Sequence, residues 1–174
     1  THFNQTVLET EETKFLFNKY FKIFPWHKID RSSVGFDLGC GSGRWAGLVA
    51  EKVGRLYCID PSINALEVAK NALTKHKNIT YINNTIDNLD LKKNSQDFGY
   101  SLGVLHHIPD TKKALIESAE FLRPGAPFLI YLYYKFDNRS LLFKLIWRLS
   151  EILRAAISRM PNKIKIIFTD IIAF

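Results

Sequence analysis

Short apolar runs alternate with helically spaced apolar positions along the first three quarters of the chain. Five runs have the length of buried strands, and they lie at 34–38, 55–60, 79–82, 97–103 and 127–134. Helical spacing separates these runs at 45–53, 62–76 and 111–122, and a further helical pattern at 7–24 ends before Pro25. Strands that alternate with helices predict right-handed crossovers and a doubly wound, mostly parallel α/β sheet.

The last forty residues follow a different pattern. Apolar positions recur with helical spacing from Leu141 onward, opposite a basic face, and Asn138 or Ser140 is placed to begin this helix. We expect a second amphipathic helix from Pro161. The sequence therefore divides into a core, 1–135, and a basic helical segment, 136–174.

The most informative stretch joins the first strand to the first crossover helix. The carboxylate of Asp37 interrupts the apolar run, and Gly39, Gly41 and Gly43 follow at alternate positions. A strand, a glycine turn and a helix together present backbone N–H groups and a positive helix end to a ligand. Glycine suits such a turn because it accepts unusual dihedral angles and lets a ligand approach closely.

The spacing of these glycines limits which classes of ligand the loop can bind. The dinucleotide-binding fingerprint separates its first and third glycines by about five residues, but Gly39 and Gly43 are four apart. Asp37 would repel a pyrophosphate and attract an ammonium group. The pattern acidic-x-Gly-x-Gly-x-Gly resembles the first motif of the class I S-adenosylmethionine-dependent methyltransferases. The resemblance implies S-adenosylmethionine as the cofactor, its amino-acid end held by Asp37, Gly39, Cys40, Gly41 and Gly43.

Two further stretches agree with this family in part. Asp60 ends the second strand, where an acidic residue bonds ribose hydroxyls in nucleotide-binding α/β folds, and it can also cap the next helix. The resemblance implies a ribose contact for Asp60, an apolar surface near the adenine from Pro61, and adenine contacts from Thr85 and Ile86. The pair Thr85-Ile86 departs from the family, which usually has an Asp followed by a small apolar residue there.

The stretch 97–110 carries the second motif. Its last six residues, Leu-His-His-Ile-Pro-Asp, resemble a segment of small-molecule methyltransferases. The resemblance implies that Leu102 and Gly103 border the cofactor and that His107 is the catalytic base; a structural role for His106 and His107 stays open. An Asn/Asp-Pro-Pro-aromatic segment, typical of base N-methylation, is not found at 101–104.

Composition adds limits on compartment and partners. The two cysteines, Cys40 and Cys58, have neither metal-ligand nor disulfide spacing, so we expect a cytoplasmic protein without a metal site. The formal charge is +7, and residues 135–174 hold eight basic and three acidic side chains. A basic amphipathic segment is typical of helices on anionic surfaces. A peripheral contact of 140–174 with the inner face of the membrane, a lid, a dimer face and a solvated face all stay open.

These patterns predict S-adenosylmethionine-dependent methyl transfer to a small-molecule, lipid-linked or sugar-linked acceptor. Two alternatives remain, a catalytically silent binding module and an NAD-dependent oxidoreductase on a similar fold. Nucleic acid is not expected as a partner, because no RNA-binding motif is found. Members of the resembled family close their sheet with an antiparallel hairpin, and no hairpin pattern is found here. We therefore expect the last two strands to lie outside this chain, in a longer protein.

Overall fold

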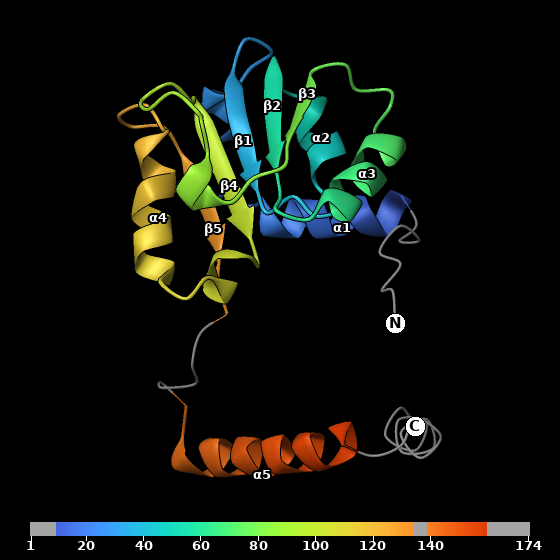
Figure 1. Ribbon diagram of the computed structural model, residues 1–174, viewed down its shortest axis with the longest axis vertical. Helices are drawn as coiled ribbons and strands as arrows, with labels where there is room; N and C mark the ends of the chain where they lie inside the picture. The colour runs from blue at the N-terminus through green and yellow to red at the C-terminus, as the bar shows by residue number, and fades with distance from the viewer. Residues whose placement is uncertain (1–9, 134–138, 160–174) are drawn as a thin grey trace. The chain divides into compact units, whose positions relative to one another are not determined.

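The computed structural model describes residues 10–133 and 139–159 (Figure 1). The chain divides into two units, Thr1–Tyr133 and Tyr134–Phe174. The first unit is built on a five-stranded sheet in the order β3-β2-β1-β4-β5, with every pair parallel. The predicted parallel α/β sheet is thus confirmed. Its strands are β1 (Val34–Leu38), β2 (Arg55–Ile59), β3 (Ile79–Ile82), β4 (Phe98–Leu102) and β5 (Phe128–Tyr131).

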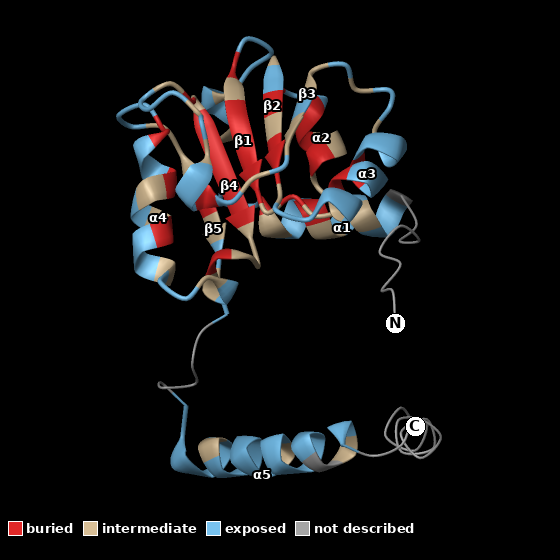
Figure 2. Ribbon diagram, in the orientation of Figure 1, coloured by how far each residue is buried: buried red, intermediate tan, exposed pale blue. Residues whose placement is uncertain are grey.

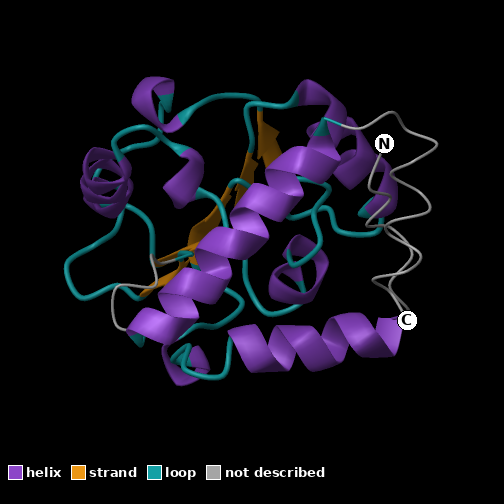
Figure 3. Cartoon of the chain, turned by 90° about the horizontal axis from the view of Figure 1, so that it is seen from below, coloured by secondary structure: helices purple, strands orange, loops and turns teal. Residues whose placement is uncertain are grey.

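Helices cover both faces of this sheet, as the view from the carboxyl ends of the strands shows (Figure 3). Buried side chains of α1, α2 and α3 pack together on one face, and those of α4 pack on the other. The α-helices of this unit are α1 (Thr10–Tyr20), α2 (Ala46–Ala50), α3 (Ile63–Ala72) and α4 (Thr111–Glu120). Single 3₁₀ turns lie between them at η2 (Trp26–Lys28), η3 (Ile86–Asn88) and η4 (Leu105–His107).

The predicted strands agree with the structure more closely than the predicted helices do. β1 and β3 have the predicted bounds, whereas the helix expected at 62–76 is α3, which ends at Ala72 because Leu73 leaves the helical conformation. The hydroxyl of Ser62 caps α3 by accepting a hydrogen bond from the Ala65 N–H at 3.3 Å. The helix expected at 45–53 is reduced to the five residues of α2. The α1 helix ends four residues earlier than predicted, at Tyr20.

The two central strands, β1 and β4, fit each other through reciprocal glycine–phenylalanine pairs. Gly35 is paired with Phe98, and Phe36 with Gly99. A Cβ on either glycine would lie 2.4 Å from the ring of the opposite phenylalanine. Both strands are almost wholly buried (Figure 2). Because the chain reverses its winding direction between β1 and β4, their carboxyl ends flank the crevice where open α/β sheets bind ligands.

The amino ends of the same strands are held by a separate polar contact. Asp97, just before β4, accepts a hydrogen bond from the Val34 N–H at 2.8 Å and forms an ion pair with Arg123. A hollow of about 400 Å³ opens beside this contact. The hollow lies at the amino ends of the strands, whereas the glycine loop lies at their carboxyl ends. We therefore assign it no part in the candidate functional site described below.

The described part of the second unit is one helix, α5 (Leu141–Ser158). The hydroxyl of Ser140 accepts a hydrogen bond from the Phe143 N–H at 3.3 Å, as expected for a residue that precedes a helix. The second helix predicted from Pro161 lies outside the described residues. Among the helices described, none has the length and hydropathy needed to cross a membrane.

Candidate functional site

The glycine loop joins β1 to α2 at the carboxyl edge of the sheet. Gly39, Gly41 and Gly43 all have positive φ angles, of 78°, 53° and 81°, which side chains rarely adopt. A Cβ on Gly39 would lie 2.4 Å from the side chain of Val104, and one on Gly43 would lie 2.7 Å from Leu73. These two glycines are therefore required by packing within the protein itself.

Gly41 differs from its neighbours because nothing fills the space beside it. A Cβ built on Gly41 meets no atom within 4 Å, and the same holds for Gly103 at the end of β4. Gly103 also has a positive φ, of 76°. Two side-chain-free positions thus face open space at the carboxyl ends of neighbouring strands, where a ligand of this fold class lies.

The sequence predicted that the loop would present free N–H groups to a ligand. In the structure, several of these N–H groups are already hydrogen-bonded, and what the loop offers is the open space beside Gly41. The N–H groups of Gly39 and Cys40 donate to the carbonyl of Ile59, at 2.8 and 3.1 Å. The N–H of Gly41 donates to Oδ2 of Asp60 at 2.9 Å. The α2 helix is too short and begins too late to direct a strong positive end at the loop. The first three N–H groups of the loop are therefore already hydrogen-bonded within the protein.

Asp60 holds the loop and the start of α3 together. Besides the Gly41 N–H, its carboxylate accepts a hydrogen bond from the Ser62 N–H at 2.8 Å. The side-chain amide of Asn83 ties down the carbonyls of Asp60 and Pro61, at 3.0 and 2.9 Å. Of the two residues considered as the cap of this helix, Ser62 takes that role, and Asp60 fixes the turn just before it. Each carboxylate oxygen keeps a further lone pair for a hydroxyl.

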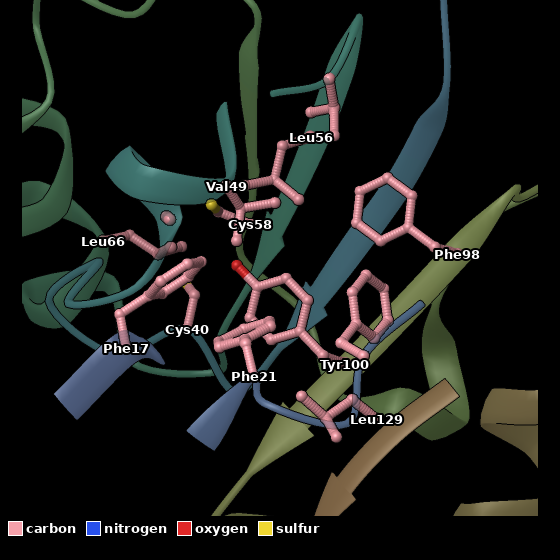
Figure 4. Close-up of a cluster of buried hydrophobic side chains, with 13 residues drawn as sticks. Phe17, Phe21, Cys40, Val49, Leu56, Cys58, Leu66, Phe98, Tyr100 and Leu129 are labelled. Atoms are coloured by element: carbon pink, nitrogen blue, oxygen red, sulfur yellow. The ribbon is translucent and has the colours of Figure 1, made fainter. Parts of the chain in front are cut away.

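Asp37 is more deeply buried than we would expect for a residue at the mouth of the glycine loop. It is only 2% exposed and is paired across the sheet with Cys58 of β2 and Tyr100 of β4. Cys58 and Tyr100 belong to the apolar cluster under α1, together with Cys40 and Phe21 (Figure 4). Oδ2 of Asp37 and the Tyr100 hydroxyl are both buried, and neither makes a hydrogen bond within the described residues.

Burial dominates the electrostatics of this carboxylate. It raises the pKa of Asp37 to about 7, since the charged form loses its hydration. The nearby Tyr100 hydroxyl lowers the pKa in part, and the negative charge of Asp60 raises it further. A buried carboxylate without a partner costs stability unless a cation or a donor pairs with it. A cation or a hydrogen-bond donor beside Oδ2 of Asp37 would offset this cost.

The cysteines lie beneath the loop. Cys58 is fully buried and Cys40 nearly so. A hydrogen bond with Cys40, then burial and the nearby Asp37, raise the pKa of the Cys58 thiol, so it stays protonated. The Cys40 thiol points back toward the Gly41 carbonyl, at 3.7 Å. Within the described chain, no group of three or more His, Cys, Asp or Glu side chains is arranged to hold a metal.

The residues expected near the adenine occupy different environments. Pro61 and Thr85 are exposed, whereas Ile86 is buried in the cluster on the α4 face of the sheet. Leu102 is half-buried at the end of β4 and packs against the cluster on the α1 face. Gly103 donates its N–H to the Tyr131 carbonyl at 2.9 Å, so β5 extends alongside it.

The two histidines follow in η4, with their rings 4.1 Å apart between centroids. His107 is exposed, whereas both ring nitrogens of His106 are shielded from solvent and make no hydrogen bond within the described residues. Burial, together with His107, lowers the pKa of His106, so its ring is neutral near pH 7. The ring of His106 also contacts that of Tyr133, at 4.5 Å.

Comparison with known proteins places this geometry in a family. A family model described as "Methyltransferase domain" matches residues 36–130, from β1 through β5. The chain belongs to the class I S-adenosylmethionine-dependent methyltransferases. Its acidic residue, three glycines and Asp60 all lie inside the matched range. The expected fold and family are thereby confirmed.

Individual methyltransferases are similar over the same region. Phosphoethanolamine N-methyltransferase 2 of Caenorhabditis elegans is 34% identical over 102 residues, 57% of this chain and 23% of the relative. Demethylmenaquinone methyltransferase of Staphylococcus epidermidis is 32% identical over 101 residues, covering 56% and 42%. A solved S-adenosylmethionine-dependent methyltransferase from Mesorhizobium loti is 26% identical with a TM-score of 0.57, covering 64% and 50%. The chain thus spans half or less of the length of these relatives.

The site fits the methyltransferase cofactor in three respects. The ammonium group of S-adenosylmethionine complements the unpartnered Oδ2 of Asp37, and the open space beside Gly41 leaves room for a ligand backbone. Asp60 has lone pairs for a hydroxyl group, and its placement at the end of β2 is the one expected for a ribose.

One set of residues near this site escaped the sequence analysis. Five aromatic rings form a continuous series from the glycine loop to η4, with neighbouring centroids 4.5 to 5.7 Å apart: Trp45, Tyr20, Tyr131, Tyr133 and His106. We call this series the aromatic rim. Tyr131 and Tyr133 are 40% and 66% exposed. The only sequence signal was the alternation of tyrosines at the end of the fifth strand.

Proposed function

We propose that this methyltransferase binds S-adenosylmethionine at the glycine loop and methylates a small-molecule acceptor held against the aromatic rim. The observation that carries the proposal is that the carboxyl end of β1 combines open space beside Gly41 with a buried oxygen, Oδ2 of Asp37, that makes no hydrogen bond within the described residues. When bound, S-adenosylmethionine supplies a methyl group that its sulfonium already activates for in-line displacement. The protein therefore has to align the acceptor and exclude water more than to activate the donor.

Different residues contact different parts of the methyl donor. Asp37 pairs with the ammonium group, and the side-chain-free positions at Gly41 and Gly103 allow close approach. Asp60 keeps the loop in place through the Gly41 N–H and accepts the ribose hydroxyls. An NAD-dependent reaction is less compatible with this loop, since Ile59 and Asp60 already use the N–H groups that a pyrophosphate needs.

The aromatic rim supports a flat or cationic acceptor. Ring faces attract both aromatic groups and ammonium groups. Tyr131 and Tyr133 extend from the strand that flanks Gly103, so an acceptor on their exposed faces would lie next to the donor site. The acceptors named for two relatives, phosphoethanolamine and demethylmenaquinone, are of these two kinds. A lipid-linked or sugar-linked acceptor would have to present an aromatic or ammonium group of the same kind.

His107 is our candidate for the base that removes a proton from the acceptor. It lies in η4, beyond the end of β4, and its ring is exposed. A base is needed when the acceptor is a hydroxyl or a protonated amine. The His106 ring contacts both the His107 ring and the Tyr133 ring.

The donor site is tested by calorimetric titration of S-adenosylmethionine into Gly41→Val. Val would fill the open space, so we expect at least a hundredfold loss of affinity. Gly125→Val is the matched control, because Gly125 also has a positive φ, of 80°, and open space, but lies at the opposite edge of the sheet. Both variants place a β-branched residue at a positive φ, so both carry backbone strain. Equal donor affinity in the two variants would refute the assignment, and so would unchanged affinity in Asp37→Ala.

Transfer itself is tested separately. The chain is incubated with S-adenosylmethionine labelled on the methyl group and with either phosphoethanolamine or a demethylmenaquinone analogue, and the labelled product is counted. We expect Tyr131→Ala to raise the KM for the accepted compound at least tenfold and to leave donor affinity within twofold. Donor binding without transfer to either compound would favour the catalytically silent binding module.

A further inference from the structure

We infer that α5 docks on an anionic lipid surface, with its apolar side against the membrane and its axis parallel to it. This goes beyond the proposed methyl transfer, since it concerns where the enzyme works. The helix places seven large apolar residues on one side, which we call the apolar face of α5: Leu141, Leu142, Leu145, Ile146, Leu149, Ile152 and Leu153.

Within the described residues, all seven side chains of the apolar face of α5 are more than half exposed. Its side chains range from 54% exposed at Leu153 to 84% at Leu141. At about 100° per residue, the seven fall within an arc of roughly 140°, wider than the seam of a two-stranded coiled coil. Soluble proteins rarely expose a continuous apolar patch of this kind without a partner for it.

The charges around this face identify the partner. Residues 139–159 contain five basic side chains and one acidic one, Glu151. Arg148 borders the apolar face, and Arg154, which pairs with Glu151 at 2.9 Å, lies on the opposite side of the helix. A wide apolar face with basic side chains beside and behind it is the arrangement of helices that lie in the headgroup region of anionic membranes.

Two other arrangements agree less well with the same residues. The helix is about 27 Å long, but its charged positions prevent it from spanning a bilayer. In a pair of helices with Leu142, Leu145, Leu149 and Ile152 in the seam, the flanking positions 146 and 153 would carry charges that choose the partner. Here both are apolar, as a flat lipid surface requires.

Vesicle flotation of the full chain tests the proposal. Vesicles of phosphatidylcholine mixed with phosphatidylglycerol are compared with vesicles of phosphatidylcholine alone. We expect binding to the anionic vesicles, at least tenfold weaker binding to the neutral ones, and release when salt rises from about 0.1 M to about 1 M. The double variant Leu149→Ser, Ile152→Ser should bind anionic vesicles at least tenfold more weakly.

The matched control removes two apolar side chains elsewhere. Val68→Ser, Ile116→Ser changes residues of α3 and α4 that are 41% and 53% exposed, and it should bind vesicles as the unchanged chain does. The proposal is wrong if the anionic vesicles are not bound, or if both double variants bind them equally. It is also wrong if the chain forms a stable dimer without lipid and Leu149→Ser, Ile152→Ser abolishes it, since a second copy would then cover the face.

Discussion

The Asp37 side chain is unfavourable for the stability of the protein without a ligand, but favourable for binding of a cation in the proposed complex. In the protein without a ligand it is a carboxylate among Cys58, Tyr100 and other apolar cluster residues, where its charged form is poorly solvated. In the proposed complex the same carboxylate faces a cation. If the proposed complex forms, the free energy that burial of this carboxylate costs the unliganded protein is offset when the cation binds.

Replacement of Asp37 should make the free protein more stable. The pKa of Asp37 in the folded state, about 7, lies above its ordinary value of 3.8, so the folded state binds the proton more tightly than the unfolded chain. Its contribution to stability is fully present below about pH 4 and is lost as pH rises to about 7. We expect Asp37→Asn to match the unchanged protein near pH 4 and to exceed it at pH 8 by on the order of 4 kcal/mol. Urea unfolding across this range measures the difference, and a difference independent of pH would contradict the assignment.

The two histidines of η4 should differ in their effect on turnover. If His107 is the base, His107→Ala lowers kcat by about 10² or more and leaves the Kd for S-adenosylmethionine within twofold. His27→Ala is the control, because His27 is an exposed histidine in η2. The comparison is made by steady-state kinetics with whichever acceptor gives turnover. Loss of turnover in His106→Ala but not in His107→Ala would transfer the role to His106.

At the scale of elements, α1 and the turn that follows it are fixed to the sheet by one row of rings. Phe17, Phe21 and Phe24 are buried, and the Phe21 ring lies edge-on to Tyr100 with centroids 5.2 Å apart. Tyr20, on the neighbouring side of the helix, reaches Trp45 and Tyr131 in the aromatic rim. The helix thus connects the packing around Asp37 with the proposed acceptor surface.

Truncation of this row should be costly. Phe21→Ala leaves a cavity between α1 and β4, and we expect it to lower the free energy of unfolding by about 3–5 kcal/mol. Phe15→Ala in α1 removes a side chain that is 68% exposed and should change the free energy of unfolding by less than about 0.5 kcal/mol. Urea unfolding of both variants tests this; similar losses would mean that α1 is not held by its buried face.

The elements also show what a sequence can and cannot predict. The bounds of β1 were predictable because a buried strand is a continuous apolar run closed by turn residues, and those of β3 because its four residues are all β-branched or aromatic. The five rings of the aromatic rim were not, since they come from four separate parts of the chain that only the folded sheet brings together. Similarly, no pattern in the sequence indicates that the Ile59 carbonyl and Asp60 take the N–H groups of the glycine loop.

At the scale of the whole chain, the proposed donor site and the proposed lipid-binding helix belong to different units. Asp37, Gly41 and Asp60 lie in Thr1–Tyr133, and α5 lies in Tyr134–Phe174. Each unit can therefore be altered separately, and failure of one proposal does not imply failure of the other. A lipid-linked acceptor would connect the two proposals, since it would lie in the membrane that we propose α5 binds.

This separation predicts that donor binding and vesicle binding are independent. We expect Leu149→Ser, Ile152→Ser to bind S-adenosylmethionine with unchanged affinity, because no residue proposed to hold the donor belongs to α5. Gly41→Val should float with anionic vesicles as the unchanged chain does, although it no longer binds the donor. Calorimetry with and without vesicles should give donor Kd values within twofold of each other. A change of fivefold or more would show that the lipid surface acts on the glycine loop, which requires a coupling free energy between the two units of about 1 kcal/mol.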